Sequence, residues 1–291
     1  MVVELVFTHH MKHAIDHLLT MSDPYRLPVC GMVYNVVNGS LPNCHVFVDM
    51  WPNFKSMVCV RSCDEYGKPE MDFATWYSPD MVSFEGMFRK IADMRKWFNG
   101  GRGVILHYVN SECKRVLANE FNVPQTAIAC DSYSLYSFDL LLNDHSAMDA
   151  LDRKTQRIVD TLPDGFEVGQ LQAKDIETVA RFQGRKFPDK VSYYQWLIQH
   201  LPSVCVRNSE GHVVAWKLTY DSGTMGALFV LPEFRKQGLA LLIAARNLKE
   251  TLTKYNAIAA VAESNEPCKT MLQNHFHGKA LGIEVSWIIC E

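Results

Sequence analysis

One segment of the chain, Val230–Ala240, combines residue types and spacing that suit the binding of an anion. It joins an apolar run that predicts a strand, Met225–Val230, to a helical pattern that runs from about Leu239 to Lys254. The first backbone N–H groups of a helix have no partner within the helix and carry partial positive charge, so an anion binds there without a basic side chain. Gly238 lets the backbone approach the ligand closely, because no Cβ intervenes. The segment therefore predicts a phosphate-binding loop between a strand and a helix.

The spacing Val-x-Pro-x-x-Arg-x-x-Gly-x-Ala in this segment resembles the acyl-CoA-binding signature of the GNAT acyltransferases. The matching positions are Val230, Pro232, Arg235, Gly238 and Ala240. The resemblance implies that acyl-CoA is a co-substrate and that the loop amides hold its pyrophosphate. The residues that it assigns to acyl-CoA are Phe229, Val230, Arg235, Lys236, Gln237, Gly238, Leu239, Ala240 and Asn265. The alternative is an ordinary strand-to-helix turn that contains a glycine, with Asn265 as a helix cap.

Composition and length set limits on the class of protein. The chain has 291 residues, enough for two domains, and its 48% hydrophobic and 21% charged residues are typical of a globular protein. A net charge of -3 argues against a nucleic-acid partner, which needs a basic face. No apolar stretch approaches the roughly 20 residues that span a bilayer. The 9 cysteines form no C-x-x-C pair, so we expect reduced thiols rather than a disulfide framework.

The N-terminus predicts no targeting segment. It has no basic region before its apolar residues, it carries Glu4 early, and its first arginine is Arg26. These features fit neither a secretory signal nor a mitochondrial transit peptide, so we expect a cytoplasmic protein. The family resemblance described below also allows the mitochondrion.

Hydrophobic periodicity predicts an α/β (α+β) protein in two halves. The resemblance implies that both halves are GNAT-like, with a mixed, mostly antiparallel sheet and flanking helices. In the first half the patterns predict helices at 10–19, 84–98 and 111–121, and strands at 30–37, 45–49, 55–61, 103–109 and 134–142. Turn residues at 38–43 predict a hairpin-type connection between the first two of these strands. In the second half they predict strands at 166–171, 203–207, 212–219, 225–230, 257–263 and 284–290, and helices at 174–181, 193–200, 239–254 and 268–275. The polar segment 143–164 separates the halves, which places the expected domains at 1–150 and 151–291.

Three segments narrow the resemblance to the glycine N-acyltransferases. Val48–Phe54 looks like the Val-Asp-x-Trp-Pro-x-Phe segment of that family, and Leu231–Arg235 and Ser264–Glu266 match it in the second half. The resemblance implies an N-terminal GNAT-like domain that lacks the CoA signature and a C-terminal catalytic domain. It also implies transfer of an acyl group from acyl-CoA to the amine of glycine or another small amino acid, by direct attack in a ternary complex. The alternative for Trp51-Pro52 is a packed strand end.

Amide formation from a thioester needs a base for the amine and a donor for the carbonyl oxygen. The resemblance assigns the donor to the backbone N–H of Val230. The glycine-conjugating enzymes carry a glutamate after the glycine that matches Gly223, but this chain has Thr224, whose hydroxyl is no base at neutral pH. The candidates to replace it are Glu263, then Asp221 and His212. The tyrosine that protonates the leaving thiol in many GNAT enzymes is absent after Asn265.

Other interpretations remain open at this point. One is an N-acetyltransferase acting on a protein or peptide, and another is a CoA-binding pseudoenzyme with an interaction role, which Thr224 and the missing tyrosine favour. A third is a metal site formed by His10, His13 and His17, which share one helix face. Because a zinc site needs three or four ligands of matched geometry, we expect a surface helix and no metal.

Overall fold

A computed structural model describes residues 2–62, 71–97, 102–121, 123, 132–183, 190–253, 255 and 258–290. Contacts between Cα atoms divide the chain into two compact units. Unit 1 comprises Met1–Ser134 and Gly282–Glu291, and unit 2 comprises Leu135–Leu281. None of the helices in the described part of the chain is both long and apolar enough to cross a membrane.

This division differs from the expected domains, 1–150 and 151–291. Residues 135–150 belong to unit 2, because the amphipathic helix α6 (His145–Val159) packs against a helix of that unit through buried Leu151. Residues 282–291 belong to unit 1, because strand β12 (Lys279–Cys290) pairs there. Pairing between strands that are far apart in the sequence leaves no local signal, so composition alone did not reveal that β12 belongs to unit 1.

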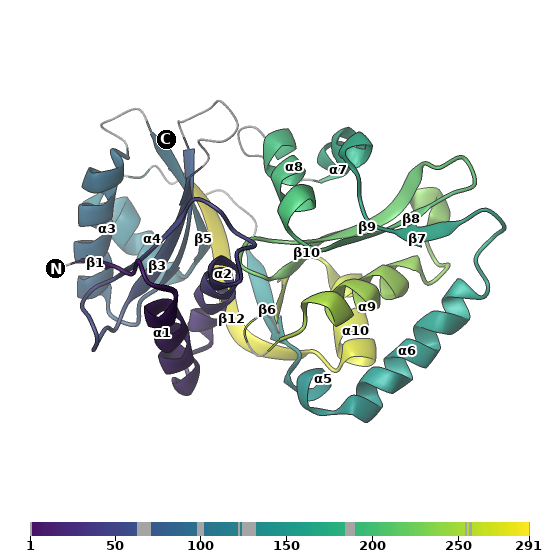
Figure 1. Ribbon diagram of the computed structural model, residues 1–291, viewed down its shortest axis with the longest axis horizontal. Helices are drawn as coiled ribbons and strands as arrows, with labels where there is room; N and C mark the ends of the chain where they lie inside the picture. Colours follow the sequence, from purple (N-terminus) through teal and green to yellow (C-terminus); the bar gives the residue numbers. More distant parts are fainter. Residues whose placement is uncertain are drawn as a thin grey trace. The chain divides into compact units, whose positions relative to one another are not determined.

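Unit 1 consists of one sheet with helices on both faces (Figure 1). Its strands follow the order β1-β2-β3-β4-β5-β12. The further elements are β1 (Val3–Glu4), α1 (Thr8–Thr20), α2 (Leu27–Val37), β2 (Cys44–Val48), β3 (Met57–Ser62), β4 (Met71–Tyr77), α3 (Met81–Arg95), β5 (Gly103–Val109) and α4 (Ser111–Glu120).

Unit 2 repeats this arrangement with strands in the order β6-β11-β10-β9-β8-β7. Helices α7 and α8 lie on one face of its sheet, and α9 and α10 lie on the other (Figure 1). Its elements besides α6 are β6 (Tyr133–Ser137), α5 (Asp139–Asn143), β7 (Glu167–Gly169), α7 (Ile176–Phe182), α8 (Lys190–His200), β8 (Ser203–Arg207), β9 (Val213–Thr219), β10 (Met225–Val230), α9 (Leu239–Thr251), β11 (Ile258–Ala262) and α10 (Glu266–Phe276).

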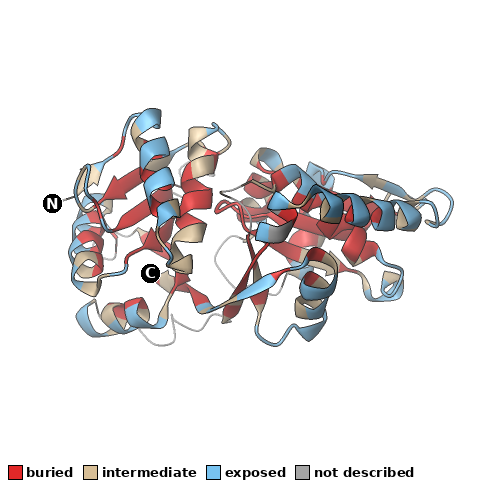
Figure 2. Cartoon of the chain, turned by 90° about the horizontal axis from the view of Figure 1, so that it is seen from below, coloured by how far each residue is buried: buried red, intermediate tan, exposed pale blue. Residues whose placement is uncertain are grey.

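The two sheets share one pairing pattern. In unit 1, β2, β3 and β4 pair antiparallel, and β4 then pairs parallel with β5 across helix α3. In unit 2, β8, β9 and β10 pair antiparallel, and β10 pairs parallel with β11 across helix α9. The central strands are buried in both units, while the helices expose their outer faces (Figure 2). The prediction of two similar halves with mixed, mostly antiparallel sheets is confirmed.

Two predicted elements are wrong. Residues 30–37 form helix α2 rather than a strand, so no hairpin precedes β2. Seven residues of this helix are buried, which leaves little polar periodicity, and its valines favour a strand by propensity. The expected strand 134–142 ends at Ser137, and helix α5 begins at Asp139. Strand β4 was not predicted, and residue 98, the end of the helix predicted at 84–98, lies outside the described residues.

The segment Val48–Phe54, which resembles the glycine N-acyltransferases, folds around one carboxylate. Asp49 Oδ1 accepts hydrogen bonds from the backbone N–H groups of Lys55 and Ser56, at 2.9 and 3.2 Å. Its Oδ2 accepts from the hydroxyl of Ser83 on α3, at 2.9 Å. Phe54 is buried, and the Trp51 ring stacks on it. The segment therefore has a packing role at the end of β2.

The histidines of α1 pack against the same segment. The ring centroid of His10 lies 4.9 Å from that of Trp51, and the His17 centroid lies 5.3 Å from that of Phe54. These contacts use the histidines as aromatic neighbours on a largely exposed helix.

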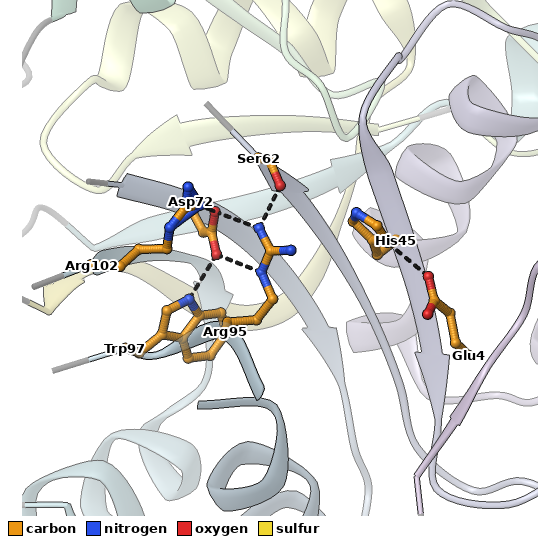
Figure 3. Close-up of polar contacts among 7 residues, drawn as sticks. All are labelled: Glu4, His45, Ser62, Asp72, Arg95, Trp97 and Arg102. Carbon is orange, nitrogen blue, oxygen red and sulfur yellow. Dashed lines mark hydrogen bonds and ion pairs between the residues drawn. The ribbon is translucent and has the colours of Figure 1, made fainter. Parts of the chain in front are cut away.

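A buried carboxylate ties together the end of unit 1 where β3, β4 and α3 meet (Figure 3). Asp72, which is 0% exposed, accepts from Arg95 Nε and Arg102 Nη1, both at 2.9 Å, and from the Trp97 indole N–H at 2.8 Å. Arg95 also donates to the Ser62 hydroxyl. A second pair in Figure 3, His45 and Glu4, joins β2 to β1 at 2.7 Å but is largely exposed. Of the two groups drawn in Figure 3, the Asp72 cluster is the one buried enough for the loss of one partner to be costly.

Replacing Asp72 with Asn should destabilise unit 1, because the substitution removes the buried negative charge that accepts hydrogen bonds from Arg95 and Arg102. We expect the free energy of unfolding to fall by roughly 3 kcal/mol, measured by urea denaturation. Asp93→Asn, on an exposed position of α3, is the matched control and should change stability by less than about 0.5 kcal/mol. Equal effects of the two substitutions would contradict this account.

Candidate functional site

The loop before α9 has the backbone of an anion-binding site. Two of its residues have positive φ, Lys236 at 63° and Gly238 at 78°. Gly238 is the N-cap of α9, and no side chain of the described residues caps this helix. The N–H groups of the first helical turn therefore have no acceptor from the helix or from a cap. A residue with a Cβ is strained at a φ of 78°, which explains the need for glycine here.

A cavity of about 640 Å³ opens at this loop. Its lining combines the end of β10, the loop, the first turn of α9 and one face of α10, and all of these elements belong to unit 2. The lining residues are Leu228, Phe229, Val230, Phe234, Arg235, Lys236, Gly238, Leu239, Ala240, Leu241, Asn265, Pro267, Cys268, Met271 and His275. The cavity thus brings together the uncapped helix and eight of the predicted acyl-CoA residues.

The edge of β10 that faces away from β9 supplies a second backbone donor. The N–H of Leu231 donates to Val214 O on the β9 side. Because residues alternate between the two sides of an antiparallel strand, the N–H and C=O of Val230 point the other way. Arg235 Nε donates to Val230 O at 3.0 Å, and its guanidinium carbon lies 5.7 Å from the centre of the Phe229 ring. Arg235 therefore holds the loop against the strand and leaves its two terminal nitrogens for a ligand.

Strand β10 has a β-bulge beside the cavity. The register with β9 shifts between Gly226 and Phe229, and Ala227 there has a φ of 48°. The parallel pairing with β11 is at Met225↔Ala259, before the bulge. The end of β10 that lines the cavity therefore lies beyond this pairing.

Asn265 has the capping role that the sequence left open. Its side-chain oxygen accepts from the backbone N–H of Cys268 at 3.2 Å and so caps α10. Asn265 also lines the cavity, as do Cys268, Met271 and His275 along one face of the helix. The cap fixes the helix start, and a ligand contact by the remaining amide group is compatible with it.

Two of the predicted site residues do not line the cavity. Gln237 is exposed in the loop. Glu263 follows β11, is 48% exposed, and its carboxylate accepts from Lys269 Nζ at 3.1 Å. Hydrogen bonds to Glu266 and Glu263 raise the pKa of Lys269, so the ammonium stays charged beside Glu263. A carboxylate paired with a cation is a weak base.

The other base candidates lie apart from the cavity. Thr224 is buried in the turn between β9 and β10, where its hydroxyl oxygen accepts from the Ser222 hydroxyl at 2.8 Å. Asp221 is buried in the same turn. His212 is exposed beside Glu210, at 3.2 Å. None of these three residues lines the cavity.

A titratable residue that the sequence did not reveal lies behind the cavity wall. Lys217 on β9 is 4% exposed and, by the register, lies opposite the bulge of β10. Burial lowers its pKa to about 8, and the charge of Cys268 partly opposes that shift. Burial raises the pKa of the Cys268 thiol, while Lys217 lowers it. From the sequence alone, a lysine inside a strand is expected at the surface. Only the packing shows that Lys217 is buried and that its charge acts on Cys268.

Unit 1 closes the corresponding position. Its helix α3 also follows a strand that pairs parallel with the next one, but Asp80 caps it by accepting from the Val82 N–H at 3.0 Å. The space between β4 and β5 there is only about 10 Å³, with Trp76, Tyr77 and Tyr108 among its lining. The Asp80 carboxylate already accepts from one N–H group of the first turn and would repel a phosphate. This agrees with a first half that lacks the CoA signature.

Comparisons with known proteins find similar sequences and similar structures. A family model described as FR47-like protein matches residues 204–277. The glycine N-acyltransferase of Bos taurus is 24% identical over 239 residues, which cover 79% of each chain. That of Mus musculus is 23% identical over 244 residues, 80% of each chain.

Solved structures extend the similarity to the whole chain. A Drosophila protein has a TM-score of 0.70 at 18% identity and covers 100% of this chain and 98% of its own. A tandem GNAT protein from the clavulanic acid biosynthesis pathway has a TM-score of 0.53 at 12% identity, with 99% and 97% covered. The chain therefore has a tandem GNAT fold. The chain resembles the glycine N-acyltransferases over about four fifths of its length, and this similarity supports an acyltransferase assignment.

The lowered pKa of Lys217 predicts a pH-dependent stability. Between pH 8 and 10.5 the unfolded lysine keeps its proton while the folded one loses it, so the free energy of unfolding should rise with pH in this window. Lys217→Met should lack this rise. At pH 7 the variant should be the more stable protein, by roughly 3 kcal/mol.

Thermal unfolding at several pH values measures the difference. Lys279→Met, at an exposed position of unit 2, is the control and should follow the wild type throughout. A difference between wild type and Lys217→Met that does not change from pH 7 to 10.5 would exclude the lowered pKa.

Proposed function

We propose that the protein transfers an acyl group from acyl-CoA to a small amine, glycine or another amino acid, by direct attack in a ternary complex. The observation that carries the proposal is the uncapped N-terminus of α9 at a cavity of about 640 Å³. Its loop matches the acyl-CoA signature, and glycine N-acyltransferases are among the similar proteins.

In this proposal the loop and the first turn of α9 bind the pyrophosphate. The free N–H groups donate to the phosphate oxygens, and Arg235 and Lys236 add positive charge beside them. The rest of the donor then extends past the end of β10. The Val230 N–H, which points away from β9, donates to the thioester oxygen as negative charge develops on it.

The leaving thiolate needs a proton, and the Lys217–Cys268 pair supports a route for it. The amine nitrogen attacks the thioester carbon, the C–S bond breaks, and the sulfur of CoA takes the proton of the Cys268 thiol. The charge of the Lys217 ammonium stabilises the Cys268 thiolate. The nitrogen of the new amide loses its proton to water, and water returns a proton to Cys268. Lys217 acts through Cys268, so it is a positioning residue with a pKa near that of a thiol, about 8.5.

The base for the acceptor amine has a weaker structural basis. Glu263 was the first candidate from the sequence, but it is paired with Lys269 outside the cavity lining. An amine that arrives already deprotonated needs no such base. A CoA-binding protein without acyl transfer is the second candidate function, which the position of Glu263 and the presence of Thr224 favour.

A charge at the start of α9 should separate binding from folding. Ala240→Glu places a carboxylate in the cavity at the helix N-terminus, where it stabilises the helix but repels a phosphate. We expect micromolar binding of acetyl-CoA or an aromatic acyl-CoA by the wild type in calorimetric titrations. The variant should bind at least about tenfold more weakly.

Ala240→Gln is the matched control, because it has the same size without the charge, and it should keep most of the affinity. The proposal fails if the folded wild type binds neither thioester, or if Ala240→Glu binds as well as Ala240→Gln.

The rate of acyl transfer to glycine, measured by the release of the CoA thiol, tests the proton route. Lys217→Met should lower the rate on the order of a hundredfold at pH 7. The ratio of wild-type to variant rates should fall as the pH rises through about 8, because the wild-type ammonium then loses its proton.

Glu263→Gln should keep its activity, because the wild-type carboxylate is already paired. A rate ratio for Lys217→Met that is constant with pH would leave Lys217 a structural role only. Tight acyl-CoA binding with no transfer to any small amine would favour the non-enzymatic alternative.

A further inference from the structure

A lysine–histidine pair connects α6 to α10 at the cavity. Lys154 Nζ lies 3.0 Å from His275 Nδ1, across 121 residues of sequence. An ammonium group only donates hydrogen bonds, so His275 Nδ1 accepts and the ring is neutral, with its proton on Nε2. Burial and the charge of Lys154 both lower the pKa of His275, which keeps the ring neutral. The pair therefore presents two kinds of donor, the remaining ammonium protons and the Nε2–H.

The positive charge of this pair is not balanced by a carboxylate. No acidic side chain within the described residues forms an ion pair with Lys154. Asp152, on the same helix, pairs instead with Lys249 at 2.5 Å. An unbalanced lysine charge on an open surface is simply solvated. Whether this pair can bind a ligand therefore depends on where it lies.

The pair lies beside the phosphate loop. His275 lines the same cavity as Gly238. Ile158, one helical turn after Lys154 on α6, comes so close to Gly238 that a Cβ there would lie 3.0 Å from its Cδ1 atom. Residues four apart share one face of a helix. One face of α6 therefore touches the loop through Ile158 and contacts His275 through Lys154.

We propose that Lys154 and His275 bind the 3′-phosphate of the CoA ribose. The inference rests on the proposed function, because it extends the same site from the pyrophosphate to the nucleotide end of the ligand. The ribose follows directly on the pyrophosphate in CoA, and its phosphate monoester carries close to two negative charges at neutral pH. Such a group matches an unbalanced ammonium beside a ring N–H.

Calorimetric titration of CoA and of 3′-dephospho-CoA tests the subsite. Wild-type protein should bind CoA roughly tenfold to a hundredfold more tightly than dephospho-CoA, the effect of two charge-assisted hydrogen bonds. Lys154→Met should reduce this preference to about twofold or less while it leaves the affinity for dephospho-CoA unchanged. His275→Gln should reduce the preference in part, because Gln offers one neutral donor.

Lys249→Met is the matched control, since it removes a neighbouring exposed lysine that already has a carboxylate partner. It should keep the full preference for CoA, and circular dichroism checks that each variant is folded. Equal, tight binding of the two ligands by the wild type would overturn the subsite and leave the proposed function intact. Binding of neither ligand would overturn the proposed function and the subsite together.

Discussion

The unpaired N–H groups at the start of α9 are the feature around which the loop, β10 and α10 are arranged. A helix end must find acceptors from a cap, from water or from a ligand. In α10 the Asn265 side chain meets this need, whereas α9 begins at a glycine whose positive φ turns the chain into the helix without a capping side chain. The loop keeps this geometry because Arg235 bonds back to Val230 O. The bulge in β10 and the cavity-facing side of α10 then leave room for a ligand in front of these groups.

The two units share one topology, but only unit 2 has an uncapped N-terminus at the helix between its parallel strands, within the part of the chain that the structure describes. Both pass from a strand through a helix to a parallel strand, yet α3 begins with Asp80 and aromatic rings fill the space beside it. The buried Asp72 cluster provides stability at another position of unit 1. The difference between the units is thus local: one residue type at the helix start and the size of the side chains around it. The two units thus share a fold although α3 and α9 begin differently.

Sequence patterns predicted the elements whose signals are local. Strands β5, β8 and β10 have the predicted bounds, and Gly238 marked the loop, because turn and strand chemistry is local. Helix α2 was missed because a helix buried on all sides has no polar face to give a helical period. Sequence patterns gave no role to Lys217 or His275, because the proposals for them rest on burial and on partners far away in the sequence. Glu263 was chosen by its place after a strand, and only the packing revealed its pairing with Lys269.

A crystal structure with bound CoA would test the central claim most directly. The account predicts pyrophosphate oxygens within hydrogen-bond distance of the backbone N–H groups of Gly238, Leu239 and Ala240, at about 2.7–3.2 Å. It also predicts that the thiol end lies beyond the end of β10 that carries Val230. CoA held elsewhere, with the first turn of α9 bonded only to water, would contradict it.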